Sequence, residues 1–140
     1  IEIAAHALRV SFSNTSLASL REVYDFRANA SFPGDNLAYG PDQIQAWMSE
    51  LLKAFPDLTL SIDHVAEVPY LGRAMDVALR WSATGTHRGA GRYGAPSGAP
   101  IFILGVSQFR IINDRVREQV TIWDDIALRR QIVTARNDNG

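Results

Sequence analysis

Hydrophobic residues recur every three or four positions in the first part of the chain, which is the spacing of amphipathic helices. This spacing covers residues 1–12 and 17–24. The polar residues 14–16 lie between them and carry side chains that can end one helix and begin the next. The N-terminal region is therefore predicted to form two short antiparallel helices.

The next segments change character at proline and glycine. Residues 29–34 are too few for a helix and end in a Pro-Gly pair, so they predict a short strand. A third helix is expected over residues 41–55, where apolar residues keep a helical spacing. Pro41 suits its first turn, and Pro56 ends it.

After Pro56 the period of the hydrophobic pattern changes from 3.6 to 2, which is typical of strands, although residues 101–112 are apolar on both faces toward their start and suggest a central strand covered on both sides. The predicted strands cover residues 58–68, 76–87, 101–112 and 115–124. Asn113-Asp114 predicts a tight hairpin between the last two. The Gly/Pro-rich stretch 87–100 is expected to be a long loop, either functional or a disordered hairpin end. Residues 131–140 are expected to form a frayed tail.

Helices followed by a run of strands predict an α+β fold. A strongly curved, mostly antiparallel sheet wrapped around the third helix would form a cone, with a cavity between the sheet and the helices. The length of 140 residues suits a single domain over residues 1–140 with one ordinary core.

Composition excludes several classes of function. The chain has no cysteine, which rules out disulfides, a thiol nucleophile and iron–sulfur or cysteine-ligated zinc sites. Its 14 Lys+Arg and 15 Asp+Glu are interspersed, so neither nucleic acid nor a membrane surface is an expected partner. No apolar run approaches the length of about 20 residues that crosses a bilayer. We expect a soluble, cytoplasmic protein.

Polar residues that share a strand face with apolar ones are the candidates for chemistry, because burial changes their acidity. His64, His87, Glu118 and Asp124 meet this criterion. A desolvated Asp124 could act as a general base, or it could cap a turn or helix that begins at Asp125. A slip of one residue in the strand would exchange Asp124 and Asp125. For each histidine, a hydrogen-bonded core or rim residue is the favoured alternative.

Other catalytic motifs are weak. The glycines of residues 89–94 have part of a dinucleotide-binding spacing, but they join two strands and open no helix, so we reject that interpretation. The three histidines lack a zinc-ligand spacing, and we expect no metal or other cofactor.

Four segments resemble the SnoaL-like polyketide cyclases of the nuclear transport factor 2-like superfamily. They are Ala54-Phe55-Pro56-Asp57-Leu58, the strand segment 80–89 with Gly85-Thr86-His87-Arg88-Gly89, the loop Gly94-Ala95-Pro96-Ser97-Gly98, and Trp123-Asp124 followed by Gln131. The resemblance covers about residues 1–132. The chain departs from it in the additional loop residues 89–92 and in lacking the histidines of the first and last strands.

The resemblance implies a cone-shaped α+β barrel, usually a homodimer, whose pocket closes a polyketide ester by an intramolecular aldol reaction without metal or nucleotide. It matches Asp124 to the general acid/base of the family and His87 to the histidine of its Gly-Thr-His motif. If the chain is an enzyme, we expect His87 or a bound water to stabilise the enolate oxygen. We expect a hydrophobic ligand to contact six further side chains, although aromatic residues can also be plain core. They are Trp47, His64, Trp81, Gln119, Trp123 and Tyr39.

Three functions remain open from the sequence. The first is a cofactor-free enzyme acting on a hydrophobic carbonyl compound. The second is a small-molecule binding module that uses the same cone without turnover. The third is an accessory dimerisation domain with a collapsed pocket. Separately, the polar strand face that includes Arg80 could be a partner surface or could be exposed to solvent.

Overall fold

A computed structural model describes residues 2–13, 17–69, 72 and 74–139. Its first two helices, α1 (Glu2–Ser11) and α2 (Leu17–Val23), confirm the predicted N-terminal pair. Ala4, Ala7 and Leu8 are fully buried, as the apolar stripe requires. Ile1 and the expected caps at residues 14–16 lie outside the described residues.

The strand predicted at residues 29–34 is longer than expected. It forms β1 (Tyr24–Phe32) and turns into β2 (Asn36–Tyr39), which the sequence did not predict. Gly34 and Asp35 have φ angles of 82° and 57°, and this left-handed pair makes the turn. The helix α3 (Gly40–Ala54) then follows with Pro41 in its first turn, as predicted.

The second half forms β3 (Thr59–Pro69), β4 (Ala74–Thr86), β5 (Pro100–Ile112), β6 (Arg115–Trp123) and α4 (Asp125–Asn139). The hairpin at Asn113 and Asp114 is confirmed, and both residues have positive φ, at 51° and 65°. The expectation of a frayed tail is wrong for residues 131–139, because these residues continue α4.

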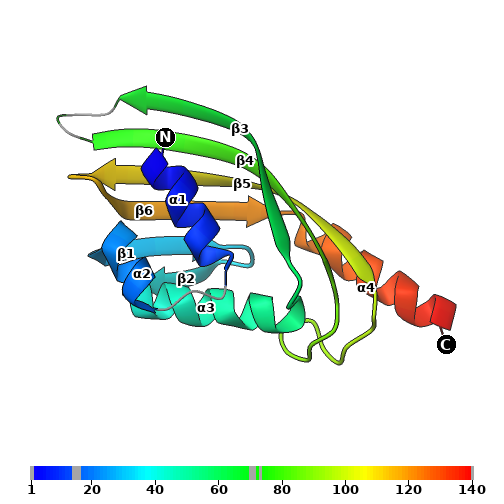
Figure 1. Ribbon diagram of the computed structural model, residues 1–140. Coiled ribbons are helices and arrows are strands. Elements are labelled where there is room, and N and C mark those ends of the chain that lie inside the picture. The colour runs from blue at the N-terminus through cyan, green and yellow to red at the C-terminus, as the bar shows by residue number, and fades with distance from the viewer. Residues whose placement is uncertain (1, 14–16, 70–71, 73, 140) are drawn as a thin grey trace.

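The six strands form one sheet in the order β2-β1-β6-β5-β4-β3. All neighbours are antiparallel except β1 and β6, which are parallel. β3 and β4 curve down to the end of α3, while α1, α2 and α3 lie on one side of the sheet and α4 extends away from it (Figure 1). The predicted α+β architecture is confirmed.

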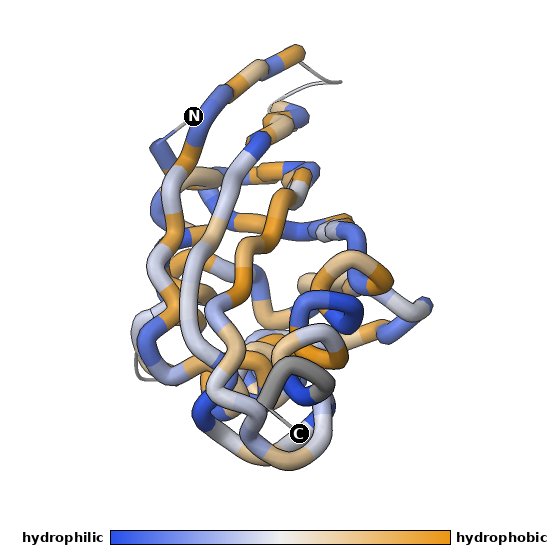
Figure 2. Tube along the Cα trace, turned by 90° about the vertical axis from the view of Figure 1, so that its right-hand side faces the viewer, coloured by the Kyte–Doolittle hydropathy of each residue, from blue (hydrophilic) through white to orange (hydrophobic). Residues whose placement is uncertain are grey.

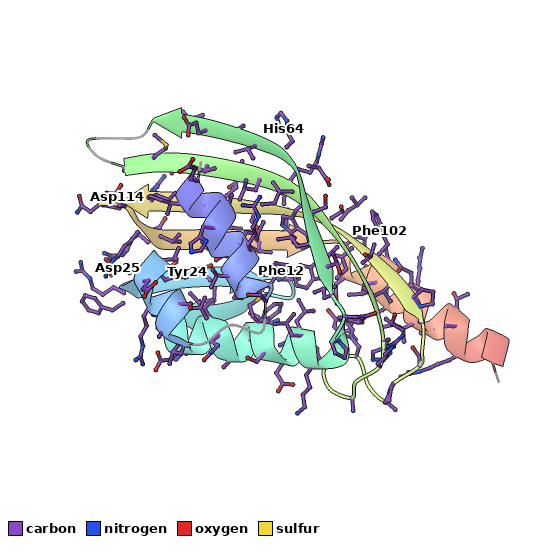
Figure 3. All side chains as sticks on the ribbon, in the orientation of Figure 1. Phe12, Tyr24, Asp25, His64, Phe102 and Asp114 are labelled. Atoms are coloured by element: carbon purple, nitrogen blue, oxygen red, sulfur yellow. The ribbon has the colours of Figure 1, made fainter. Side chains whose placement is uncertain are left out.

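The sheet has one covered and one open face. Hydrophobic and hydrophilic residues alternate along the strands (Figure 2), and the side chains toward the helices are buried in β5 at every second position. Phe12 and Tyr24 lie between the helices and the sheet (Figure 3). The open face exposes apolar side chains instead, including Leu104 at 58% and Ile122 at 57%.

Two bulges change which side chains reach the covered face. In β3 the register shifts between Ile62 and His64, and in β6 it shifts where Arg110 pairs with Glu118 and Ile111 with Val116. A bulge inserts one residue, so every later side chain moves to the opposite face. The residue ranges of β3 and β6 were therefore predicted correctly, but the side of the sheet on which their side chains lie beyond each bulge was not.

In the part of the chain that the structure describes, no helix is long and apolar enough to cross a bilayer.

Candidate functional site

The motif residues before and after β4 tie that strand to the end of α3. Asp57 accepts hydrogen bonds from the backbone N–H of Thr86 at 2.7 Å and from its hydroxyl at 2.8 Å. The N–H of Gly89 donates to the carbonyl of Ala54 at 3.1 Å. A Cβ on Gly89 would lie 1.7 Å from the carbonyl oxygen of Lys53, so only glycine allows this approach. These motif residues are structural.

His87 lies at the same connection between the end of β4 and the end of α3. Its ring is fully buried, and Nδ1 accepts hydrogen bonds from the Ser97 hydroxyl at 2.8 Å and the Ser97 N–H at 3.3 Å. The ring proton therefore lies on Nε2, which is buried and has no partner among the described residues. Burial lowers the pKa of His87, with a smaller contribution from Arg136, so the ring is held neutral.

The loop beyond Gly89 makes a tight turn. Gly94 donates to the carbonyl of Gly91 at 2.9 Å, and both glycines have positive φ, at 152° and 85°. Arg92 and Tyr93 are the two central residues of this turn. The glycine spacing that resembled a dinucleotide fingerprint thus presents two side chains to the body of the protein.

Three predicted tryptophans come together beside this turn. The ring centroids of Trp47 and Trp123 are 5.6 Å apart, and those of Trp123 and Trp81 are 6.0 Å apart. Phe32 stacks on Trp47 at 4.1 Å, and the guanidinium carbon of Arg92 lies 4.1 Å from the Trp47 ring centroid. Aromatic surface therefore continues from the buried core to the loop.

A cavity of about 350 Å³ opens next to these aromatic residues. It is lined by Pro33, Gly34, Asn36, Trp47, Arg92, Tyr93, Trp123, Asp125 and Arg129. Its volume is within the range of ligand pockets, which is about 300–1,000 Å³. The lining combines aromatic rings with one carboxylate and two guanidinium groups, so we take it as the candidate functional site.

Asp125 is the carboxylate of this cavity. It accepts hydrogen bonds from the Tyr93 hydroxyl at 2.8 Å, the Trp123 indole at 3.3 Å and Arg129 at 2.8 Å. Burial would raise the pKa of Asp125, but the bonds from Arg129, Tyr93 and Trp123 outweigh it and hold the pKa below the ordinary value. Asp125 is thus ionised at neutral pH. Burial, followed by the bond to Asp125, raises the pKa of Tyr93.

Asp124 faces away from the cavity. It is exposed, and its carboxylate accepts the backbone N–H of Ala127 at 2.9 Å, which caps the first turn of α4. The bulge in β6 explains the difference, because it exposes Glu118, Val120 and Ile122 on the open face. The alternative that Asp124 caps the following helix is confirmed, and the expectation that it shares a buried face is corrected.

Gln119 lies inside, within a chain of buried hydrogen bonds. The Tyr24 hydroxyl donates to Gln119 Oε1 at 2.5 Å, and Gln119 Nε2 donates to Thr121 at 2.8 Å. Thr121 contacts Ser107 at 2.8 Å, and Trp81 donates to Ser107 at 3.0 Å. Burial raises the pKa of Tyr24. This row of hydrogen bonds pairs the polar side chains on the covered face of the sheet, and it ends at Trp81 in the tryptophan cluster.

Two other predicted ligand contacts lie elsewhere. His64 follows the bulge in β3 and projects from the outer side of the sheet (Figure 3). Tyr39 is 61% exposed at the end of β2. Of the six predicted ligand contacts, Trp47 and Trp123 line the cavity; Trp81, Gln119, His64 and Tyr39 are not in its lining, and neither is His87.

Tyr93 and Arg129 were not predicted as site residues, and Asp125 was predicted only as the alternative to Asp124 under a one-residue slip of the strand. Arg92 and Tyr93 had a signal, because they lie in the long loop that was expected to be functional. Asp125 and Arg129 stand four residues apart, the spacing of an ion pair on a helix. Among the described residues no group of His, Cys, Asp and Glu could hold a metal ion.

The family model for the SnoaL-like polyketide cyclases matches residues 2–132. The chain belongs to this family. The resemblance inferred from four short segments is therefore confirmed. The nuclear transport factor 2-like fold that it implied for this chain is confirmed as well.

Solved structures agree with the fold. A candidate SnoaL-like polyketide cyclase from Jannaschia sp. CCS1 has a TM-score of 0.76 at 21% identity, covering 94% of this chain and 91% of its own. The candidate polyketide cyclase IdmH from Streptomyces antibioticus has a TM-score of 0.76 at 22% identity, with 94% and 96% covered.

A protein with a ketosteroid isomerase-like fold from Catenulispora acidiphila, in complex with trimethylamine, has a TM-score of 0.73 at 14% identity, with 94% and 92% covered. A search of curated protein sequences found no match.

Proposed function

We propose that this SnoaL-like chain binds a planar polyketide-like ester in the cavity beside Trp47 and Trp123, and closes a ring in it by a cofactor-free intramolecular aldol reaction. The observation that carries the proposal is Asp125, an ionised carboxylate at the wall of an aromatic-lined cavity. Family membership supports the reaction class.

Asp125 is the base in this scheme. Its carboxylate takes the proton from a carbon between two carbonyl groups, and the C–H electron pair moves into the enolate. The enolate carbon then attacks another carbonyl carbon of the same molecule, which forms the C–C bond. That carbonyl oxygen takes a proton and becomes a hydroxyl, so Asp125 returns to its ionised form.

Arg129 supports this chemistry electrostatically. Its Nε lies 2.8 Å from Asp125, which places positive charge beside the point where the enolate develops. The carbon between the carbonyls of a 1,3-dicarbonyl compound is acidic, so its proton can be removed by a base weaker than an ordinary enolate requires. His87 acts as a positioning residue in this proposal, since it fixes the loop that carries Arg92 and Tyr93.

Deuterium exchange tests the proposal without knowledge of the natural substrate. Ethyl 2-naphthoylacetate, an aromatic β-keto ester, is incubated with the protein in D₂O, and loss of the proton between its carbonyls is followed by NMR. We expect wild type to accelerate exchange and Asp125→Asn to lose the acceleration by about 100-fold or more, the scale of a general base. Exchange at the rate of the buffer alone would overturn the enzymatic proposal.

A binding module without turnover is the second candidate. The observation in its favour is that Asp125 already accepts three hydrogen bonds, which makes its carboxylate a weak base. This candidate predicts that aromatic compounds bind and stabilise the protein while exchange stays at the buffer rate.

A further inference from the structure

Arg92 lies across the ring of Trp47, and each of these two side chains has one hydrogen-bond donor without an acceptor in the described part of the chain. The Trp47 indole Nε1 and the Arg92 Nη1 are both buried, and neither has a partner among the described residues. Both side chains line the 350 Å³ cavity. Buried donors are nearly always paired in folded proteins, so two of them at one cavity indicate an absent acceptor.

The nearby acidic group does not supply that acceptor. Asp125 is the one carboxylate among the described residues that line the cavity, and it is paired with Arg129 at 2.8 Å. The lining therefore holds two guanidinium groups and one carboxylate, which leaves the charge of Arg92 unbalanced.

The backbone under Arg92 is fixed on both sides. The turn closes through the bond from Gly94 to Gly91 at 2.9 Å, and Gly89 is bonded to the end of α3 at 3.1 Å. Arg136 donates to the carbonyl of Ala95 just beyond the turn. Movement at this position is consequently a change of the Arg92 side chain, not of the loop.

We propose that Arg92 and the indole N–H of Trp47 together bind a carboxylate carried by an aromatic ligand of this cavity. A guanidinium offers a planar pair of N–H groups that matches a carboxylate, and the indole N–H adds a third donor. When Arg92 turns to the carboxylate, the Trp47 face that it covered becomes available to the aromatic ring of the ligand.

The inference rests on the proposed function in placing the ligand in the same cavity, and it adds the class of ligand. Both unused groups only donate, so they select an oxygen acceptor and reject a cation. A free carboxylate, carried by the ligand in addition to the ester group of the proposed substrate, balances the charge of Arg92, which a neutral ester or amide group alone does not.

Binding of two matched probes tests this. 2-Naphthoate and the neutral 2-naphthamide are titrated into the full chain by calorimetry. We expect wild type to bind 2-naphthoate at least ten-fold more tightly than 2-naphthamide. Arg92→Gln is expected to weaken 2-naphthoate about ten-fold or more and to cause no loss of affinity for 2-naphthamide, because the Trp47 face stays open to its ring. Trp47→Phe, which keeps the ring and removes the N–H, should weaken 2-naphthoate several-fold.

Arg92→Lys and Arg88→Gln complete the set. Lysine keeps the charge without the planar pair of donors, so an intermediate affinity is expected. Arg88 is an exposed arginine of the same loop, and Arg88→Gln should bind as wild type does. Equal affinity of wild type for the two probes, absence of binding, or an unchanged 2-naphthoate affinity in Arg92→Gln would overturn the inference.

These outcomes are separable from those of the exchange experiment. Arg92-dependent binding without deuterium exchange supports the inference and overturns the enzymatic proposal. Deuterium exchange that depends on Asp125, together with 2-naphthoate binding that does not depend on Arg92, supports the enzymatic proposal and overturns the inference.

Discussion

The hydroxyl of Tyr93 donates a 2.8 Å hydrogen bond to the carboxylate of Asp125, joining the loop after β4 to the first turn of α4. Trp123 and Arg129 bond to the same carboxylate at 3.3 Å and 2.8 Å. Two segments 32 residues apart in the sequence thereby form one wall of the cavity.

Tyr93→Phe removes one donor from Asp125 and keeps the ring. We expect the free energy of unfolding at pH 7 to fall by about 1.5–3 kcal/mol, as for a hydrogen bond to a charged group. The pKa of Asp125 should rise toward the ordinary aspartate value of about 3.9, as measured by NMR titration of its carboxyl carbon.

The sign of the pH dependence follows from the lowered pKa of Asp125. Its stabilisation is present above the ordinary pKa of about 3.9 and is lost as pH falls through the lower native value. The stability difference between wild type and Tyr93→Phe should therefore shrink below about pH 4. The exposed Tyr39→Phe is the control, and an unshifted Asp125 in Tyr93→Phe would contradict the account.

His87 predicts a second pH effect. Because burial lowers its pKa in the folded protein, the unfolded chain takes up the proton first. Stability should therefore decline as pH falls from about 6.5 toward the native pKa of His87. Urea unfolding of His87→Asn, whose amide oxygen can accept the Ser97 bonds, should show a flatter decline over this window.

His64→Asn is the matched control for that experiment, because His64 lies on the exposed face of β3. Its stability curve is expected to follow wild type. If His87→Asn keeps the full decline, protonation of His87 is not its cause.

Gly105 gives space to Trp81 on the paired strand. A Cβ at Gly105 would lie 2.2 Å from Cζ2 of Trp81, so Gly105→Ala must displace the indole from its bond to Ser107. Denaturant unfolding should show a loss of about 2–3 kcal/mol, the scale of an overpacked core.

A double-mutant cycle checks the cause. Trp81→Phe lacks the ring atoms nearest Gly105, so Gly105→Ala should cost less than half as much in that background. Equal costs in both backgrounds would show that the indole is not the obstacle.

The open face of the sheet supports the homodimer expected from the resemblance. Leu104 and Ile122 are 58% and 57% exposed there, and contiguous exposed apolar surface marks interaction sites. We propose that two copies pair through this face. Light scattering should show a dimer, and Leu104→Glu or Ile122→Glu a monomer. Phe26→Glu, at a 75% exposed residue of β1, should remain dimeric. A monomeric wild type would refute the proposal.

Local spacing was sufficient to predict most of the elements, and the resemblance of four motif segments indicated the family. The apolar stripe between Pro41 and Pro56 marked α3, and a period of two marked four of the six strands. The start of β5, apolar on both faces, was expected to be covered on both sides, but Phe102 and Leu104 are exposed. Alternation could not predict the facing beyond a bulge. One inserted residue in β3 and one in β6 place His64 and Asp124 on the open side of the sheet. No residue type at either position indicated a bulge from the sequence.

The site required contacts between distant segments. Trp47 comes from α3, Tyr93 from the long loop and Asp125 from α4, and only the fold brings their side chains to one cavity. The sequence had left open whether Asp124 or Asp125 faces inward. The helix cap made by Asp124 and the three bonds to Asp125 answer that question.

The comparison of Asp125→Asn with Asp124→Asn tests the central claim most directly. Both changes are isosteric and adjacent, and each removes one carboxylate. In deuterium exchange of ethyl 2-naphthoylacetate, Asp124→Asn should retain the wild-type rate, since asparagine also caps helices. Asp125→Asn, folded by circular dichroism, should fall to the buffer rate. Full exchange by Asp125→Asn, or its loss in Asp124→Asn alone, would contradict the account.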